Sequence, residues 1–398
     1  MKKQLVISLG ILFFLLLATT AVVLYAKGYH FGLSKGNLQV AETGLLVATS
    51  KPDGASVFVN GHLTTATDNT INLFPGEYDI KIEKEGYFTW QKKLKIQAQV
   101  VAKAEALLFP TAPKLESITA SGVENPIIDP SQSRIAYTVL SQSARKNGVY
   151  ILDMSSRPIL TLRSAATQIV DDTVDNFSKA KITWSPDGKE LVATISGTSL
   201  NPTTYLLKAN EFNQAPSDIT ATLTTTQAAW ESDRLEKNQA RINTLKINLR
   251  EFIAKNFKIL SWSPDETKIL YQASSSASFP IIINPRLIGT DSTPEERTLK
   301  ESNIYVYDVK EDKNYKIPVT NPQTPLPLSW FPDSKHLVYT HDKKIEIVEY
   351  DGINATTIYA GPFVGNYVFP WTNESKVLML TNLGNPDILP NLYTIELK

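Results

Sequence analysis

The side chains that could perform acid–base or metal chemistry are sparse in this chain. It contains four histidines, and only His336 and His341 stand close enough in sequence to share a metal ion. Imidazole is a frequent zinc ligand, but this pair lies on either side of a predicted strand turn, and no other histidine has ligand spacing. A chance pair is therefore favoured, and no metal site is predicted.

Acidic residues form two further patterns. Asp171, Asp172 and Asp175 lie close together and could hold calcium weakly. They lack the Asx-x-Asx-x-Asx-Gly order of calcium loops, so a solvated loop is favoured. Three other aspartates, at 187, 265 and 333, recur with one turn motif, which indicates turn formation rather than catalysis.

Motifs of nucleophilic and nucleotide chemistry are missing. The sequence contains no Gly-x-Ser-x-Gly elbow, no phosphate-binding loop and no dinucleotide fingerprint. We therefore expect that the protein is not an enzyme, has no catalytic residue and binds no cofactor.

The turn motif is the dominant repeat of the chain. Trp-Ser-Pro-Asp-Gly at 184–188 recurs as Trp-Ser-Pro-Asp-Glu at 262–266 and as Trp-Phe-Pro-Asp-Ser at 330–334, with weaker copies at 128–133 and 371–375. The aromatic residue anchors a strand end, proline fixes φ, and aspartate bonds its own backbone. The residues expected to build the repeat are Trp184, Pro186, Asp187, Trp262, Pro264, Asp265, Trp330, Pro332, Asp333 and Trp371.

Each turn leads into a continuous apolar run, which indicates a strand buried on both faces. Blades stacked around an axis bury strands in this way. The motif and the strands that follow it resemble the TolB-like β-propeller family over about residues 114–398. The resemblance implies a propeller, here of five blades, with a β-sandwich of similar turns as the alternative. We expect residues 114–120 to pair with 391–397 and close the last blade, which removes an exposed edge.

Composition limits the class of protein. The chain has 398 residues, 40 basic and 40 acidic side chains, and no cysteine. Balanced charge argues against a nucleic-acid partner. Without cysteine there is no disulfide, thiol chemistry or lipid-modified cysteine, which suits a protein of the cell envelope.

The N-terminal segment has the length of a membrane span. Residues 1–3 form a basic tail, and the 23 residues from Gln4 to Ala26 carry no charge. About 20 apolar residues suffice to cross a bilayer, and the tail favours a cytoplasmic N-terminus. We expect a single-pass anchor with the bulk of the chain outside the cytoplasmic membrane; a cleaved signal peptide is the alternative.

Residues 44–108 predict a small β-domain. Asn60-Gly61 is a hairpin signal, and Tyr78, Ile80 and Ile82 alternate with charged residues as in a half-buried strand. The stretch at 52–61 and the Phe-Pro-Gly-Glu-Tyr to Lys-Glu-Gly-Tyr stretch at 74–87 resemble the PEGA family. The resemblance implies a small extracytoplasmic β-sandwich of envelope proteins. Residues 109–113 are expected to be a linker.

Two insertions interrupt the β pattern. Residues 224–257 predict a helix with a heptad stripe, which either lies on the propeller or projects to dock a partner. The residues of the possible docking stripe are Leu235, Ile242, Leu245, Leu249 and Phe252. The other insertion, at 274–302, contains a short apolar run and is expected on the same interaction face.

The sequence as a whole predicts a mainly β protein: a transmembrane helix, a PEGA-like domain, then a propeller with one helical insertion. We interpret it as a membrane-anchored binding or scaffold protein of the envelope, with an envelope protein or a glycan as its partner. Two alternatives stay open: a propeller enzyme that acts on glycans through paired carboxylates, and a purely structural surface-layer component.

Overall fold

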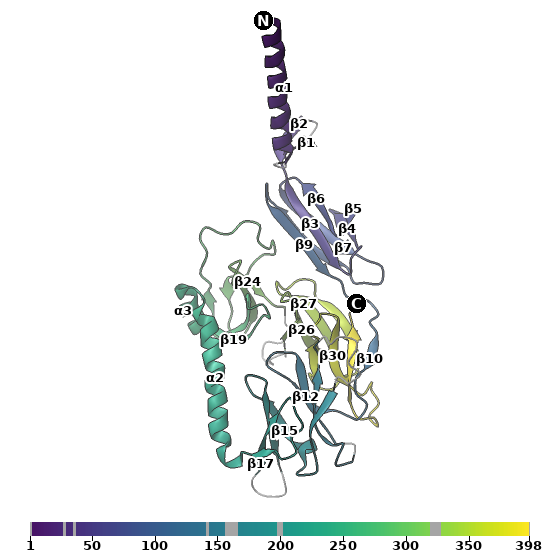
Figure 1. Ribbon diagram of the computed structural model, residues 1–398. Coiled ribbons are helices and arrows are strands. Elements are labelled where there is room, and N and C mark those ends of the chain that lie inside the picture. The colour runs from purple at the N-terminus through teal and green to yellow at the C-terminus, as the bar shows by residue number, and fades with distance from the viewer. Residues whose placement is uncertain are drawn as a thin grey trace. The chain divides into compact units, whose positions relative to one another are not determined.

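The computed structural model describes the backbone of residues 2–26, 29–34, 37–140, 143–155, 166–196, 202–318 and 328–397. Side chains are described for residues 7–23 and, within those ranges, from 42 onward. The chain is mainly β and divides into two compact units (Figure 1). The first unit contains residues 1–109 and 283–294, and the second contains residues 110–282 and 295–398.

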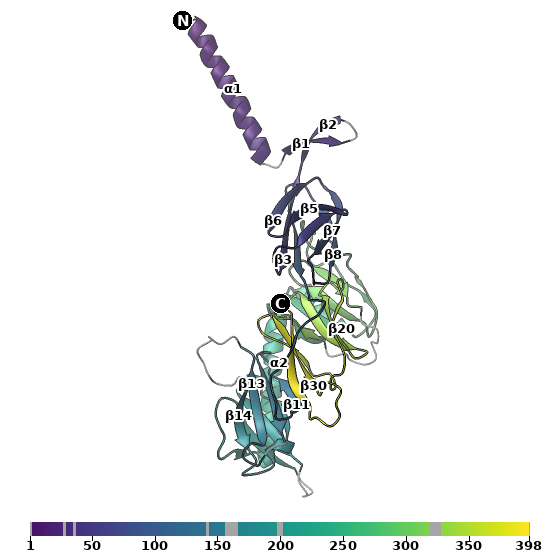
Figure 2. The same cartoon turned by 90° about the vertical axis from the view of Figure 1, so that its right-hand side faces the viewer.

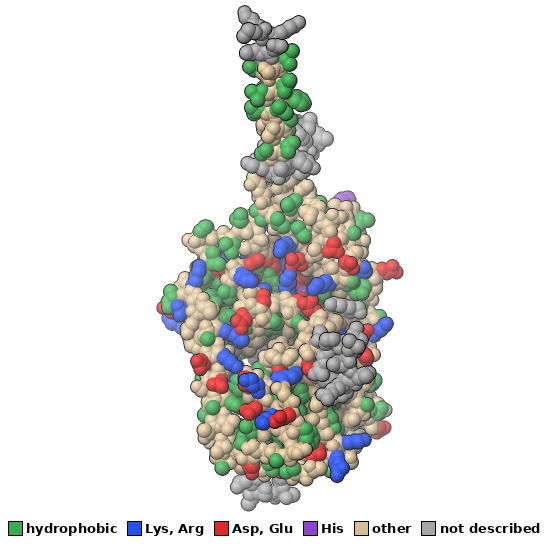
Figure 3. Space-filling view, viewed as in Figure 1, with side chains coloured by type: hydrophobic (Ala, Val, Ile, Leu, Met, Phe, Trp, Pro, Cys, Tyr) green, Lys and Arg blue, Asp and Glu red, His purple; other side chains and the backbone are tan. Residues whose placement is uncertain are grey.

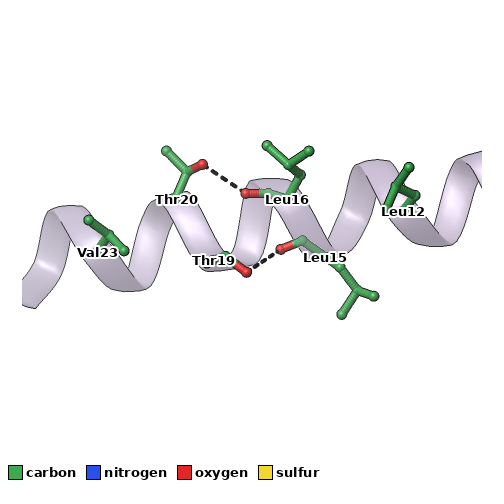
Figure 4. Close-up of a pocket in the computed structure, with 6 residues that line it drawn as sticks. All are labelled: Leu12, Leu15, Leu16, Thr19, Thr20 and Val23. Atoms are coloured by element: carbon green, nitrogen blue, oxygen red, sulfur yellow. Dashed lines mark hydrogen bonds between the residues drawn. The ribbon is translucent and has the colours of Figure 1, made fainter.

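The first unit begins with helix α1 (Lys2–Ala26), followed by a hairpin of β1 (Tyr29–Ser34) and β2 (Asn37–Glu42). The Thr19 and Thr20 hydroxyls donate to the carbonyls of Leu15 and Leu16, four residues earlier, at 2.7 and 2.8 Å (Figure 4). These bonds satisfy both hydroxyls within the helix. Among the described residues, no helix meets the length and apolarity required to cross a membrane. The membrane span at 4–26 therefore stays a prediction.

The rest of the first unit is a pair of sheets with one shared core (Figure 2). The core side chains include Leu46 of one sheet and Ile82 of the other, both fully buried. The predicted hairpin at Asn60-Gly61 joins two strands of the second sheet, and both residues have positive φ, 49° and 81°. The first sheet has the order β6 (Asn69–Leu73), β3 (Gly44–Lys51), β9 (Val101–Leu107); the second has the order β5 (His62–Ala66), β4 (Ser56–Val59), β7 (Gly76–Glu83), β8 (Trp90–Ile96).

A loop from far along the chain completes this unit. Lys92 of β8 forms an ion pair with Asp291 at 2.8 Å, and both side chains are nearly buried. The backbone N–H of Lys95 donates to the Ser292 hydroxyl at 2.9 Å. The middle of the predicted 274–302 insertion is therefore folded onto β8, so it does not form the free interaction surface that the sequence led us to expect.

The second unit consists of five four-stranded antiparallel sheets, which we name A to E in chain order. Sheets A to D are meanders of short strands, as the repeated turns predict, and sheet E combines three such strands with β10. Sheet A contains β11 (Glu124–Ile128), β12 (Arg134–Val139), β13 (Gly148–Asp153) and β14 (Ala166–Asp171); sheet B contains β15 (Lys181–Trp184), β16 (Glu190–Ile195), β17 (Thr203–Lys208) and β18 (Ser217–Asp218); sheet C contains β19 (Phe257–Trp262), β20 (Lys268–Ala273), β23 (Ile304–Asp308) and β24 (Lys313–Lys316); sheet D contains β25 (Ser329–Trp330), β26 (His336–His341), β27 (Lys344–Glu349) and β28 (Thr356–Ala360); sheet E contains β29 (Val368–Pro370), β30 (Lys376–Thr381), β31 (Asn391–Glu396) and β10 (Leu115–Ser117).

Sheet E joins the two ends of the second unit. The N-terminal strand β10 pairs antiparallel with the last strand, β31, with Leu115 opposite Ile395. The pairing predicted between residues 114–120 and 391–397 is thus confirmed. It covers the edge of β31 that a chain ending in three strands would expose.

Shared apolar clusters join successive sheets. One contains Ile182 of sheet B and Ala136 of sheet A, a second contains Leu270 of sheet C and Trp330 of sheet D, and a third joins sheets E and A. Sheets D and E meet where strand β26 contacts strand β29. Five sheets in chain order, with A against B, C against D, D against E and E against A, form a β-propeller rather than a two-layer sandwich.

Helices and one two-stranded sheet complete this unit. The insertion between sheets B and C is helical, but it is two helices rather than one: α2 (Leu223–Asn243) and α3 (Ile247–Asn256). The predicted range of 224–257 also ran one residue into β19. The remaining elements are η1 (Phe177–Lys179), η2 (Thr220–Thr222), β21 (Ala277–Ser278) and β22 (Thr298–Leu299).

Candidate binding cavity

The five turn motifs have one backbone geometry, including the two weak copies. In each, an N–H bonds back to the carbonyl three residues earlier, for example Gly188 to Ser185 at 2.9 Å and Glu374 to Trp371 at 3.2 Å. The donor residue has positive φ in all five turns. Only one of these donors is glycine, so four non-glycine residues hold the left-handed conformation in these turns. The donors and their φ values are Gln132 (56°), Gly188 (71°), Glu266 (57°), Ser334 (59°) and Glu374 (59°).

The turn aspartates bond within their own turns. Asp187 accepts hydrogen bonds from the Ser185 hydroxyl at 2.7 Å and from the Lys189 N–H at 3.0 Å. The Lys189 N–H, with the Ser185 hydroxyl, lowers the pKa of Asp187. These contacts match the turn-forming role that the sequence indicates.

Asp265 repeats this arrangement in a more enclosed place. Burial opposes its ionisation, but hydrogen bonds from Ser263 and Thr267 outweigh burial and lower the pKa of Asp265 to about 2. The carboxylate is therefore charged at neutral pH, and its oxygens accept hydrogen bonds from its own turn.

The fold separates the two histidines of the predicted pair. His336 and His341 are the two ends of strand β26, not the two sides of a turn. His336 Nδ1 contacts Asp333 at 2.6 Å, and His341 Nε2 contacts Asp342 at 3.0 Å. Within the described ranges, no group of three or more His, Cys, Asp or Glu side chains could hold a metal ion.

The acidic cluster near β14 is engaged in local bonds. Asp172 accepts from the Ser178 N–H and hydroxyl, at 2.8 and 2.6 Å, at the start of η1. Asp175 accepts from the Tyr205 hydroxyl at 3.1 Å. These carboxylates position a loop and a neighbouring strand.

A cavity of about 890 Å³ opens where the turns of four sheets meet the helical insertion. In each of these turns, the residue directly after the one whose carbonyl accepts the turn hydrogen bond lines the cavity: Pro130, Pro264, Pro332 and Thr372. The opposite wall is α2, which contributes Arg234, Asn238, Arg241 and Ile242. The cavity has the size of a ligand site.

Helix α2 connects sheets B and C through polar contacts. Lys237 Nζ donates to the Pro186 carbonyl of the sheet B turn at 3.3 Å, and Arg241 Nε bonds Glu266 of the sheet C turn at 2.8 Å. Figure 1 shows α2 running from the β17 sheet to α3 beside β19. None of the side chains of α2 is buried.

The predicted docking stripe is divided by the break between the helices. Leu245 and Leu249 are 8% and 2% exposed and pack in the core of sheet C, whereas Leu235 is 57% exposed. Phe252 is half-buried against Phe279, and Ile242 faces the cavity. The expectation of one continuous stripe is therefore wrong, because the chain changes direction between Asn243 and Ile247.

The tryptophans of the repeat occupy three environments. Trp330 is fully buried between sheets C and D. Trp184 is 8% exposed and donates to the Ile127 carbonyl of sheet A at 3.2 Å. Trp262 is half-buried and lines the cavity, and Trp371 packs half-buried between sheets E and A. The repeat thus places one aromatic face where a ligand can reach it.

The cavity lining contains one more basic than acidic side chain. Its lining residues include two arginines and one carboxylate, Glu266, which is already paired with Arg241. Arg234 is paired outside the lining, with Glu231 at 2.7 Å, in an exposed contact. Elsewhere, basic and acidic side chains are interspersed on the face shown in Figure 3.

Sequence reasoning missed these lining residues. Arg234, Asn238 and Arg241 stand at helical spacing, but a polar helix face is ordinarily solvated. Ser261 was also missed: its hydroxyl oxygen is buried at the cavity and has no hydrogen-bond partner among the described residues. The only sequence signal was the position of the insertion directly before a repeat turn.

Comparison with known proteins identifies the first β-domain. Residues 43–111 match the PEGA domain family, so the chain carries a PEGA domain. No curated protein matches the chain. Among solved structures, a putative TolB from Agrobacterium tumefaciens is 14% identical, covers 67% of this chain and 76% of its own, and has a TM-score of 0.23. TolB from Acinetobacter baumannii is 12% identical, covers 80% of this chain and 59% of its own, and has a TM-score of 0.20.

The expectation that the protein is not an enzyme is corrected by the same comparison. An oligogalacturonate lyase from Vibrio parahaemolyticus is 10% identical, covers 81% of this chain and 86% of its own, and has a TM-score of 0.26. Prolyl endopeptidases are also similar, with a TM-score of 0.24. Missing catalytic motifs therefore do not exclude an enzyme, because propellers occur in enzymes as well. These distant likenesses assign no activity to this chain.

Proposed function

We propose that this is an envelope-associated binding protein that uses the propeller cavity between α2 and β19 to hold its partner. The observation that carries the proposal is the cavity itself. It has the features of a binding site: a volume of about 890 Å³, a half-buried aromatic side chain in Trp262, and a polar wall from α2.

Placement in the envelope rests on two features of the N-terminal part. The 23 uncharged residues from Gln4 to Ala26 follow a basic tail, and a PEGA domain follows at residues 43–111. We propose that residues 4–26 anchor the chain in the cytoplasmic membrane, with its N-terminus inside and the PEGA domain and propeller outside. The partner is then an envelope protein or an envelope glycan.

A reporter enzyme fused after Lys398 tests the location. The fusion is expected to be active when the reporter requires export and inactive when it requires the cytoplasm. Cytoplasmic activity alone would refute the proposal. A mature N-terminus near Lys27 would replace the anchor by a cleaved signal peptide and leave the binding role intact.

Site-specific photo-crosslinking tests the cavity. A photoreactive amino acid at Asn238, which lines the cavity, is expected to crosslink a partner in intact cells. The matched control is the same group at Leu235, which lies on the same helix, is 57% exposed and does not line the cavity. Crosslinking from 235 alone would move the site to the outer face of α2, and no crosslink from either position would contradict a binding role for this region.

A further inference from the structure

One wall of the cavity is the edge of a β-sheet. Strand β19 is the terminal strand of sheet C, and five of its six residues, including Ile259, Ser261 and Trp262, line the cavity. Such an edge carries backbone groups that can pair with another strand.

The register of β19 determines which backbone groups point into the cavity. The Ser263 N–H donates to the Lys268 carbonyl of β20 at 3.0 Å, and the Ser274 N–H donates to the Asn256 carbonyl at 2.8 Å. Since bonded and non-bonded positions alternate in an antiparallel pair, Trp262 and Ile259 turn their N–H and C=O groups away from β20. A bulge at Leu260 separates the two positions.

The arginines of α2, on the opposite wall, determine which charge a ligand in the cavity should carry. Arg234 and Arg241 are seven residues apart on α2, which places them about 10 Å apart along the helix axis. Each guanidinium has an exposed carboxylate partner, Glu231 or Glu266, that an incoming carboxylate can replace at low cost. The buried Ser261 hydroxyl of the β19 wall, without a partner among the described residues, adds a neutral donor or acceptor.

We propose that the cavity binds an extended acidic peptide segment of a partner protein, which adds a strand to β19 and places its carboxylates on Arg234 and Arg241. Strand addition provides affinity through main-chain hydrogen bonds, and the arginines provide selectivity. This inference rests on the proposed binding function and names the chemistry of its ligand. A peptide fits better than a sugar chain, because it supplies both the N–H and the C=O groups that the edge of β19 requires.

The test uses the full-length protein in detergent and a fluorescent eight-residue peptide of alternating threonine and glutamate. Anisotropy is expected to show saturable binding that weakens as salt increases. A peptide with glutamine in place of glutamate removes the charge. A peptide N-methylated at every amide keeps the charge but has no N–H left to donate to a neighbouring strand, and both peptides are expected to bind at least about tenfold more weakly.

Matched variants locate the site. Arg241→Gln and Arg234→Gln are each expected to weaken binding about tenfold. Lys237→Gln removes the same charge from the same helix, outside the cavity lining, and is expected to change binding by less than about twofold. All three side chains lie on a helix without buried residues, so the variants are expected to fold normally.

Three results would overturn the inference. The first is equal binding of the parent and N-methylated peptides, which would exclude strand addition. The second is displacement of the peptide by an oligosaccharide of uronic acid units, with no effect of N-methylation, which would make the ligand a glycan. The third is no saturable binding of any peptide. None of these would alter the reporter result, so failure of the peptide inference is distinguishable from failure of the proposed location.

Discussion

Sheet C meets its two neighbours in different ways. Toward sheet D it forms an apolar cluster in which Leu270 and Val306 pack with Trp330, and all three are fully buried. Toward sheet B the contacts run through α2, which has no buried residue and is held by Lys237 and Arg241. The same turn motif joins the first two strands of sheets B, C and D. The repeated motif therefore determines how each sheet is built, whereas the contact between two neighbouring sheets depends on the segment inserted between them.

The buried junction should dominate stability. Trp330→Ala removes a fully buried ring between sheets C and D, so we expect a loss of about 3–5 kcal/mol in the free energy of unfolding. Trp262→Ala, at the cavity, should cost about half as much because its ring is only half-buried. Urea unfolding of the full-length protein measures both. Equal losses would show that the two junctions are energetically alike.

The two helices of the insertion should differ in the same way. Leu249→Ala in α3 leaves a void in the core of sheet C and should cost about 3 kcal/mol. Leu235→Ala on α2 makes the same chemical change at an exposed site and should stay within about 0.5 kcal/mol. A large effect at 235 would mean that the outer face of α2 is covered.

A buried ion pair beside the sheet C–D junction should make stability depend on pH. Burial opposes the charged form of His336, but Asp333, at 2.6 Å, outweighs it and raises the pKa of the imidazole. This contribution is complete below the unfolded pKa of about 6.5 and is lost as pH rises through the raised folded value. The melting temperature should therefore fall as pH rises above about 6.5, and His336→Gln should flatten that fall. An unchanged slope in the variant would assign the pH dependence to other groups.

The smallest effect is expected at the polar junction. Arg241→Gln breaks an ion pair whose side chains are 41% and 54% exposed, so the free energy of unfolding should change by about 0.5 kcal/mol or less. Differential scanning calorimetry at low and high salt measures the change. A loss of several kcal/mol would mean that α2 holds the propeller together rather than forming one wall of a cavity.

Much of the fold was predictable, because its signals are local. Proline and aspartate at fixed offsets mark three of the five turns, and the run before the first repeat leaves a strand that pairs with β31. The break in the insertion was not predictable: Thr244 to Lys246 contains neither glycine nor proline, and the heptad pattern continues across it. The cavity residues of α2 were hardly predictable from the sequence, because a polar helix face has the same residue pattern whether it faces solvent or a binding site.

The sequence by itself determined which segments form strands, where they turn, and that a PEGA domain precedes a repeated β-array. It did so because turn chemistry and hydrophobic alternation act over a few residues. Only the tertiary structure decided that Trp330 is buried while Trp262 faces a cavity, that Leu249 enters the core while Leu235 stays outside, and that residues 283–294 fold onto β8. A side-chain pattern specifies which face of an element is apolar, but the neighbour that covers this face is set by packing between segments distant in the chain.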